Sequence, residues 1–218
     1  MLLGGELSEL AIVHDGGMLI RGDRIDVVGP SSEIEKHSGD AEVIDAGGKV
    51  VLPGFVDAHT HLVFAGNRLE DFERRACGET YEQIAKAGGG IWSTVETTRT
   101  ASEAELFAQA WRHAEWFLRC GTTTVESKSG YGLTPEDELK ILRVMRQLNQ
   151  ETPLEIVPTF LGAHAVPHAT NADEYADLVV NEMLPRVASD CLAEFCDIFC
   201  ERGYFDIEQS RRILGAPT

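Results

Sequence analysis

From residue 53 onward, apolar runs typical of β-strands alternate with segments of helical periodicity, and this alternation restricts the fold more than any other feature. Strands that alternate with helices form βαβ units, whose strands run parallel in one sheet. We expect strands over residues 53–61, 122–127, 154–160 and 195–199. The helices between and after them are expected to begin at cap residues, namely Ser102, Thr134, Asn171 and Asp206. The third of these helices is expected to cover about residues 172–187, with Pro185 ending or bending it.

The number of these units sets the expected architecture. A closed (β/α)8 barrel needs roughly 250 residues, and the stretch after His61 has room for about half of one. We therefore expect an α/β fold in which residues 51–218 form a partial (β/α)8 TIM barrel, about its first four β/α units. Residues 1–50 contain short β-type runs with turn residues between them, including an expected strand over 11–14. They predict part of a small β-sandwich domain.

Two histidines end the first strand of the expected barrel. The run Pro53–His61 is apolar and closes with His59 and His61. Residues i and i+2 of a strand point to the same face, so the two imidazoles leave the strand end side by side. Two neutral imidazoles placed in this way are half of the ligand set of a divalent metal ion. The alternative is a pair of surface histidines at a strand end.

Further polar residues follow the expected strand ends, where the working groups of a (β/α)8 barrel lie. The candidates are Arg68, Tyr81, Tyr131 and His164. Arginine offers a fork of donors to a carboxylate, and tyrosine and histidine offer donors or acceptors to ring heteroatoms. The set suits a small, anionic, planar substrate. The alternatives are a solvated loop charge for Arg68, a packed aromatic at a helix start for Tyr81 and a hydrogen-bonded core histidine for His164.

Four other features of the sequence allow a structural interpretation, and two of them also allow a functional one. Lys128 lies two residues after Glu126 on the second expected strand, and an ion pair between them is favoured over a role as a ligand. The triple glycine 88–90 is either a flexible turn or a nest of backbone N–H groups that holds an anion. His113 lies off the apolar stripe of its helix and is expected in solvent. The five cysteines contain no CxxC motif and are expected to be reduced, buried thiols.

Charge and hydropathy exclude several classes of function. The net charge of −17 argues against binding to nucleic acid, which requires Lys/Arg surfaces, and against anionic membrane surfaces. No apolar run reaches the length of a membrane-spanning helix. The N-terminal residues lack a basic segment followed by a long apolar one, so no secretory signal is expected. Together with the thiols, this predicts a cytoplasmic protein.

The motifs also resemble a known family. The run 53–61 is similar to the opening barrel strand of the metal-dependent amidohydrolase superfamily. Within it, the chain resembles the imidazolonepropionases of histidine degradation over essentially residues 10–213. The segments that carry this resemblance are 59–68, 88–95, 121–124, 128–132, 159–164 and 209–212.

The resemblance implies hydrolysis of the ring amide of 4-imidazolone-5-propanoate to N-formimidoyl-L-glutamate. It implies one Zn²⁺ or Fe³⁺ per complete site, with His59 and His61 as ligands, and a homodimer for the complete protein. It also implies substrate contacts from the four candidates named above, Arg68, Tyr81, Tyr131 and His164.

The family's further ligands and its acid/base residues match no position up to Thr218, so no catalytic residue is assigned. The resemblance therefore implies an N-terminal part with little or no activity of its own. Two alternatives stay open: another cyclic-amide amidohydrolase, and a non-catalytic fragment that associates with a partner.

Overall fold

The computed structural model describes residues 11–80, 83–84 and 87–216. The chain divides into two compact units, Met1–Pro53 and Gly54–Thr218. All the candidate metal ligands and substrate-binding residues belong to the second unit.

The first unit contains a β-hairpin and one helix. Strands β1 (Gly16–Arg21) and β2 (Arg24–Pro30) pair antiparallel, and helix α1 (Ser31–Ser38) packs on β1. The strand expected over 11–14 is wrong: residues 11–13 have no regular structure, because Ala11 and Asp15 have positive φ angles that break an extended run. Helix α1 was not expected.

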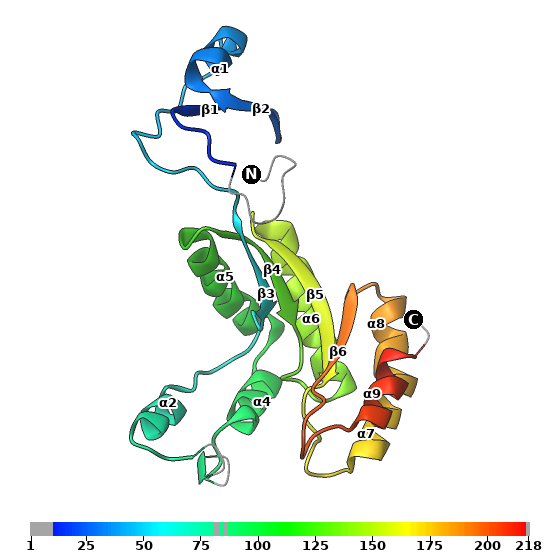
Figure 1. Ribbon diagram of the computed structural model, residues 1–218. Helices are drawn as coiled ribbons and strands as arrows, with labels where there is room; N and C mark the ends of the chain where they lie inside the picture. The colour runs from blue at the N-terminus through cyan, green and yellow to red at the C-terminus, as the bar shows by residue number, and fades with distance from the viewer. Residues whose placement is uncertain (1–10, 81–82, 85–86, 217–218) are drawn as a thin grey trace. The chain divides into compact units, whose positions relative to one another are not determined.

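The second unit is built on a four-stranded parallel sheet in the order β3-β4-β5-β6. Its strands are β3 (Phe55–Thr60), β4 (Thr122–Lys128), β5 (Glu155–Ala163) and β6 (Phe195–Ile198). Their carboxyl ends lie at the same end of the sheet (Figure 1). The predicted parallel α/β sheet, a partial (β/α)8 barrel, is confirmed.

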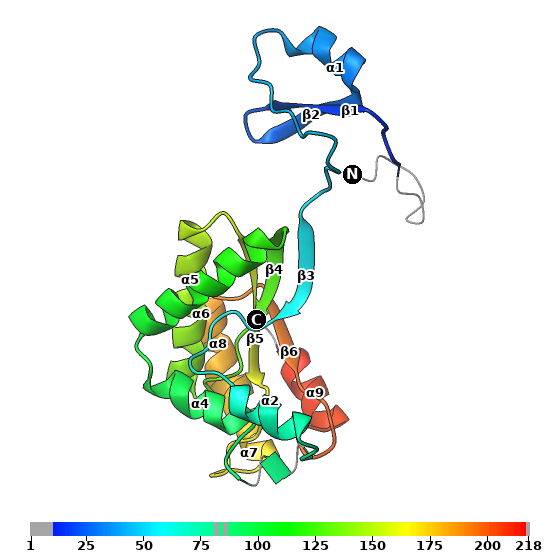
Figure 2. The same ribbon diagram turned by 90° about the vertical axis from the view of Figure 1, so that its left-hand side faces the viewer.

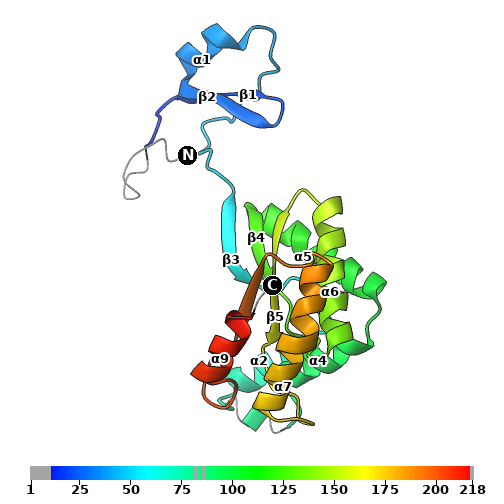
Figure 3. The same ribbon diagram turned by 90° about the vertical axis from the view of Figure 1, so that its right-hand side faces the viewer.

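Helices follow the strands and begin where their caps predict. Ser102 and Asp206 each form a reciprocal capping box, and the side chains of Thr134 and Asn171 each accept one backbone N–H. The helices are α5 (Glu103–Arg119), α6 (Pro135–Glu151), α7 (Ala172–Leu178), α8 (Leu184–Ser189) and α9 (Ile207–Leu214). Figure 3 shows α7 and α9 on the β6 side of the sheet. None of the helices within the described ranges is long and apolar enough to cross a membrane.

Two helices that the sequence did not predict lie near the carboxyl ends of the strands. They are α2 (Leu69–Ala76) and α4 (Ile91–Thr100), and Figure 2 shows both beyond the arrowhead of β3. Between α7 and α8 the chain forms a π-helical turn, η1 (Val179–Met183). Pro185 follows this turn and has no N–H to donate to the carbonyl four residues earlier, which favours a local change of helical winding. The helix expected over 172–187 is therefore interrupted by a π-helical turn just before Pro185.

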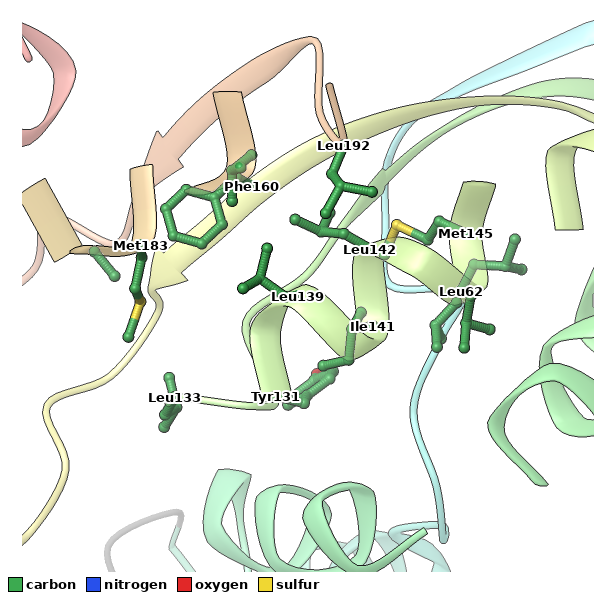
Figure 4. Close-up of a cluster of buried hydrophobic side chains, with 14 of the residues drawn as sticks. Leu62, Tyr131, Leu133, Leu139, Ile141, Leu142, Met145, Phe160, Met183 and Leu192 are labelled. Carbon is green, nitrogen blue, oxygen red and sulfur yellow. The ribbon is translucent and has the colours of Figure 1, made fainter. Parts of the chain in front are cut away.

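The core lies between the sheet and α6. Leu139, Leu142 and Met145 of α6 are almost fully buried and meet Phe160 of β5 and Leu62 (Figure 4). The three α6 residues follow one another at intervals of three, so they lie on one face of the helix. This packing fixes α6, and with it the loop that joins β4 to α6.

The thiols differ from the expectation of burial. Within the second unit the side chain of Cys196 is half-buried, and the others are exposed because they lie at helix ends and in loops; these are Cys77, Cys120, Cys191 and Cys200. All five cysteines are free. Large apolar side chains are also exposed on the two outer strands, namely Phe55, Val56 and Phe195.

Truncation of the core leucine in α6 tests this packing. Leu142→Ala should lower the free energy of unfolding by about 2–5 kcal/mol, because it removes buried methyl groups and leaves a cavity. The matched control, Leu69→Ala, changes a leucine that is 66% exposed and should stay within about 0.5 kcal/mol of the wild type. Urea denaturation followed by circular dichroism measures both. Equal losses in the two variants would show that α6 does not form the core described here.

Candidate functional site

The two histidines predicted as metal ligands lie at the carboxyl end of β3. The centroids of their rings are 6.3 Å apart, with the planes at 70° to each other. His59 is exposed, whereas His61 is half-buried. The Nδ1 atom of His61 is buried and has no hydrogen-bond partner within the described residues. Because buried polar atoms are almost always bonded, this nitrogen fits a group that binds an additional atom, such as a metal ion.

His61 lies within a cluster of rings from three strand ends. It stacks on His164, with ring centroids 4.9 Å apart and planes at 12°, and its centroid is 4.7 Å from that of Tyr131. The rings of Tyr131 and His164 are 5.3 Å apart. His61 follows β3, Tyr131 follows β4 and His164 follows β5. The structure thus brings together three residues that are far apart in the sequence.

Arg68 joins this cluster from the loop after β3. Its Nη2 donates to the hydroxyl of Tyr131 at 2.9 Å, and its Nε donates to the hydroxyl of Thr94 at 3.0 Å. Its guanidinium carbon lies 5.6 Å from the centroid of the Tyr131 ring. Arg68 is therefore a held, half-buried cation rather than a solvated loop charge. Tyr81, the remaining candidate, lies outside the described residues.

Burial keeps the clustered imidazoles neutral. Desolvation lowers the pKa of His61 to about 3, and coupling to the neighbouring His164 ring acts in the same direction. Desolvation also lowers the pKa of His164, against its bond to the Gly130 carbonyl. A neutral imidazole has a free lone pair, which is the form that coordinates a metal ion.

An ion-pair network connects β4 with β6. The Nζ atom of Lys128 lies 2.7 Å from a carboxylate oxygen of Glu126 and 3.0 Å from one of Asp197. Burial alone would lower the pKa of Lys128, but these two bonds outweigh it and raise the pKa. Lys128 is the ion-pair partner of Glu126, as the sequence analysis favoured. Asp197 is a second partner of Lys128, which the sequence did not indicate.

The triple glycine holds an anion that the chain itself supplies. The N–H of Gly90 donates to the Asp71 carboxylate at 2.8 Å. A Cβ added at Gly89 would collide with the same carboxylate. Gly88 and Gly90 have φ angles of +89° and +75°, which favour glycine. The segment therefore joins α2 to α4 around Asp71.

His113 contradicts the expectation of a solvated side chain. Its Nδ1 lies 3.0 Å from the carbonyl oxygen of Leu62, and its ring stacks on Phe64 at 5.0 Å. The helix packs this face on the segment after β3 rather than on the sheet, so the apolar stripe did not reveal it. Next to His113 lies a cleft of about 630 Å³, whose lining includes Arg68, Arg112 and Trp116.

Comparison with known proteins defines the class. The sequence model of the protein family described as "Amidohydrolase family" matches residues 42–179. The chain belongs to this family.

The most informative relatives are imidazolonepropionases. The protein of Solibacter usitatus is 56% identical over 216 residues, which cover 98% of this chain and 52% of that protein. The protein of Brevibacillus brevis is 50% identical, covering 99% and 52%, and that of Geobacillus kaustophilus is 48% identical with the same coverage. The chain therefore resembles part of these enzymes and spans about half of their length.

Among solved structures, an N-isopropylammelide isopropylaminohydrolase from Burkholderia multivorans matches with a TM-score of 0.43 and 20% identity. The match covers 82% of this chain and 40% of that one.

The buried histidines make the stability of the metal-free chain depend on pH. The unfolded chain binds a proton on each histidine near pH 6.5, whereas folded His61 does so only near pH 3. The unfolded state therefore binds more protons between these values, and the free energy of unfolding should fall by about 1.4 kcal/mol for each pH unit below 6.5.

His61→Asn should flatten this dependence, whereas His37→Asn, which changes an exposed histidine of the first unit, should not. Urea titrations of metal-free protein at pH 7.5 and 5.0 give the comparison. An unchanged slope in His61→Asn would contradict the burial of this ring.

Proposed function

We propose that the chain is part of an imidazolonepropionase, which hydrolyses the ring amide of 4-imidazolone-5-propanoate to N-formimidoyl-L-glutamate. The reaction adds water across one C–N bond of the ring. The observation that carries the proposal is the cluster of His61, Arg68, Tyr131 and His164 from three strand ends. The names of relatives that are 44–56% identical to the chain support the same reaction.

His59 and His61 would hold the metal ion, Zn²⁺ or Fe³⁺, and the unpaired ring nitrogen of His61 fits this role. When bound, such an ion lowers the pKa of a water molecule to roughly 7 and so supplies hydroxide at neutral pH. Catalytic zinc sites commonly have three protein ligands. No group of three or more His, Cys, Asp or Glu side chains within the described ranges is placed to hold a metal.

The chain's own residues would bind and orient the substrate. Arg68 would pair with the propanoate group, since a guanidinium matches a carboxylate with two parallel hydrogen bonds. Tyr131 and His164 would fix the ring, and we assign Tyr81 to the same task. The packing of these groups against one another limits their freedom before substrate binds, which lowers the entropic cost of orientation.

The proposal also includes the location of the protein in the cell and its assembly. Free thiols and the family's metabolic chemistry favour a cytoplasmic protein. The exposed Phe55, Val56 and Phe195 on the outer strands favour an assembly in which other segments cover them. We therefore propose that activity belongs to the assembled protein. The resemblance to imidazolonepropionases adds the proposal that the complete protein is a homodimer.

Metal affinity tests the incomplete ligand set. Equilibrium dialysis of the isolated chain against Zn²⁺ should show weak binding, because two imidazoles provide fewer ligands than a catalytic site uses. His59→Asn and His61→Asn should each abolish it, whereas His168→Asn, which changes an exposed histidine, should not. Tight one-to-one binding by the wild type would contradict a half-formed ligand set.

Substrate turnover tests the reaction. The isolated chain should convert little 4-imidazolone-5-propanoate, and activity should arise when the chain is co-expressed with the remaining half of the Solibacter usitatus relative. In this complex Arg68→Gln should raise KM by about 10–100-fold, as expected for a lost charged hydrogen bond. Arg75→Gln, which changes an exposed arginine of α2, is the control. A co-purified complex with metal that leaves the substrate intact would refute the proposed reaction.

A further inference from the structure

Among the described residues of the second unit, one carboxylate is entirely buried. Glu138, in the first turn of α6, has no exposed surface. Its Oε2 accepts the N–H of Gly130 at 2.9 Å, and its Oε1 accepts those of Gly132 at 2.7 Å and Leu133 at 2.8 Å. A polar group removed from water is tolerated only when its hydrogen bonds are satisfied. This side chain therefore fixes three peptide groups of one loop.

The loop that it fixes, Ser129–Leu133, is strained. Gly130 has a φ angle of +108° and Leu133 one of +54°. A left-handed conformation costs a non-glycine residue about 1–2 kcal/mol and persists only where the surroundings determine it. A Cβ added at Gly132 would lie 2.5 Å from the backbone nitrogen of Glu138, so the loop also packs directly on α6.

The same loop controls two members of the ring cluster. Tyr131 lies between the peptide groups that Glu138 binds, and its ring contacts His61. The carbonyl of Gly130 lies 2.9 Å from Nδ1 of His164. Glu138 thus bonds to the loop on both sides of Tyr131.

We propose that Glu138 is a positioning residue, whose carboxylate fixes the loop Ser129–Leu133 so that Tyr131 and His164 are held against His61. The effect of Glu138 on substrate binding rests on the proposed function, because Tyr131 and His164 are the groups assigned there to the substrate ring. The competing role is stabilisation of the N-terminus of α6 alone, where a negative charge interacts favourably with the helix dipole.

Glu136 provides the matched control. It lies two residues earlier in the same turn of α6, is exposed, and pairs with Arg186 rather than with the loop. A change at Glu136 alters the charge at the helix N-terminus and leaves the loop bonds intact. Any effect common to both positions therefore reports on the helix, and an effect confined to Glu138 reports on the loop.

The first measurement needs no substitution. In wild-type protein, hydrogen exchange followed by NMR should show the amides of Gly130, Gly132 and Leu133 protected to within about tenfold of the amides in the middle of α6. Exchange of these three amides at the rate of an open loop would overturn the proposal, whatever the variants do.

The second measurement follows the ring nitrogens of the histidines by long-range ¹H–¹⁵N NMR. Glu138→Gln should shift the signals of His61 and His164, because an amide cannot accept all three N–H bonds, and Glu138→Asp should give smaller shifts in the same direction. Glu136→Gln should leave both signals in place, with His14 and His37 of the first unit as internal references.

A loss of stability without these shifts would assign Glu138 to the helix terminus and overturn the proposal. If Glu138→Gln does not fold, Glu138→Asp and the exchange rates decide. Because neither readout uses substrate, shifted signals in a complex that fails to turn over 4-imidazolone-5-propanoate would refute the function and leave the positioning role intact.

Discussion

The four described strands of the second unit run in one direction, and the positions of the candidate groups at their ends follow from this. The carboxyl ends of parallel strands meet at one edge of a sheet, so residues that follow β3, β4 and β5 converge although helices separate them in the chain. His61, Tyr131 and His164 occupy three such ends. An antiparallel strand at any of these places would carry its residue to the opposite end. The capped helices α5 and α6 matter for the same reason, because each returns the chain to the start of the next strand.

A cation next to these strand ends helps to keep His61 neutral. Lys128 is held between Glu126 and Asp197, and its positive charge is one of the causes that lower the pKa of His61. A buried ion pair contributes little net stability, since desolvation offsets the attraction between the charges. Its value here is electrostatic: a fixed cation opposes protonation of a nearby imidazole and leaves its lone pair available. One carboxylate oxygen of Glu126 and the hydroxyl of Thr159 are buried without a hydrogen-bond partner in the described part of the chain. Both atoms can therefore accept a further hydrogen bond.

Local signals explain which features the sequence predicted. Capping boxes such as that of Ser102 act within four residues, so the starts of α5, α6, α7 and α9 were found. Helix α4 begins at Gly90 without a side-chain cap, and its start depends on the distant carboxylate of Asp71. The cluster at the strand ends was predicted in position, but the bond between Arg68 and Tyr131 was not, because it joins loops 63 residues apart. The role of His113 was missed for the same reason.

Exposure of the sheet and exposure of the candidate metal ligands are linked. β3 is an outer strand, and it carries both the exposed apolar side chains Phe55 and Val56 and the exposed candidate ligand His59. An unpaired strand edge offers backbone donors and acceptors to any further strand. A segment that paired with this edge would cover the apolar side chains and approach His59 at the same time. Pairing at the outer side of β3 and the addition of ligands beside the two imidazoles are therefore one geometric event, which is why we expect weak metal binding while the outer strand is exposed.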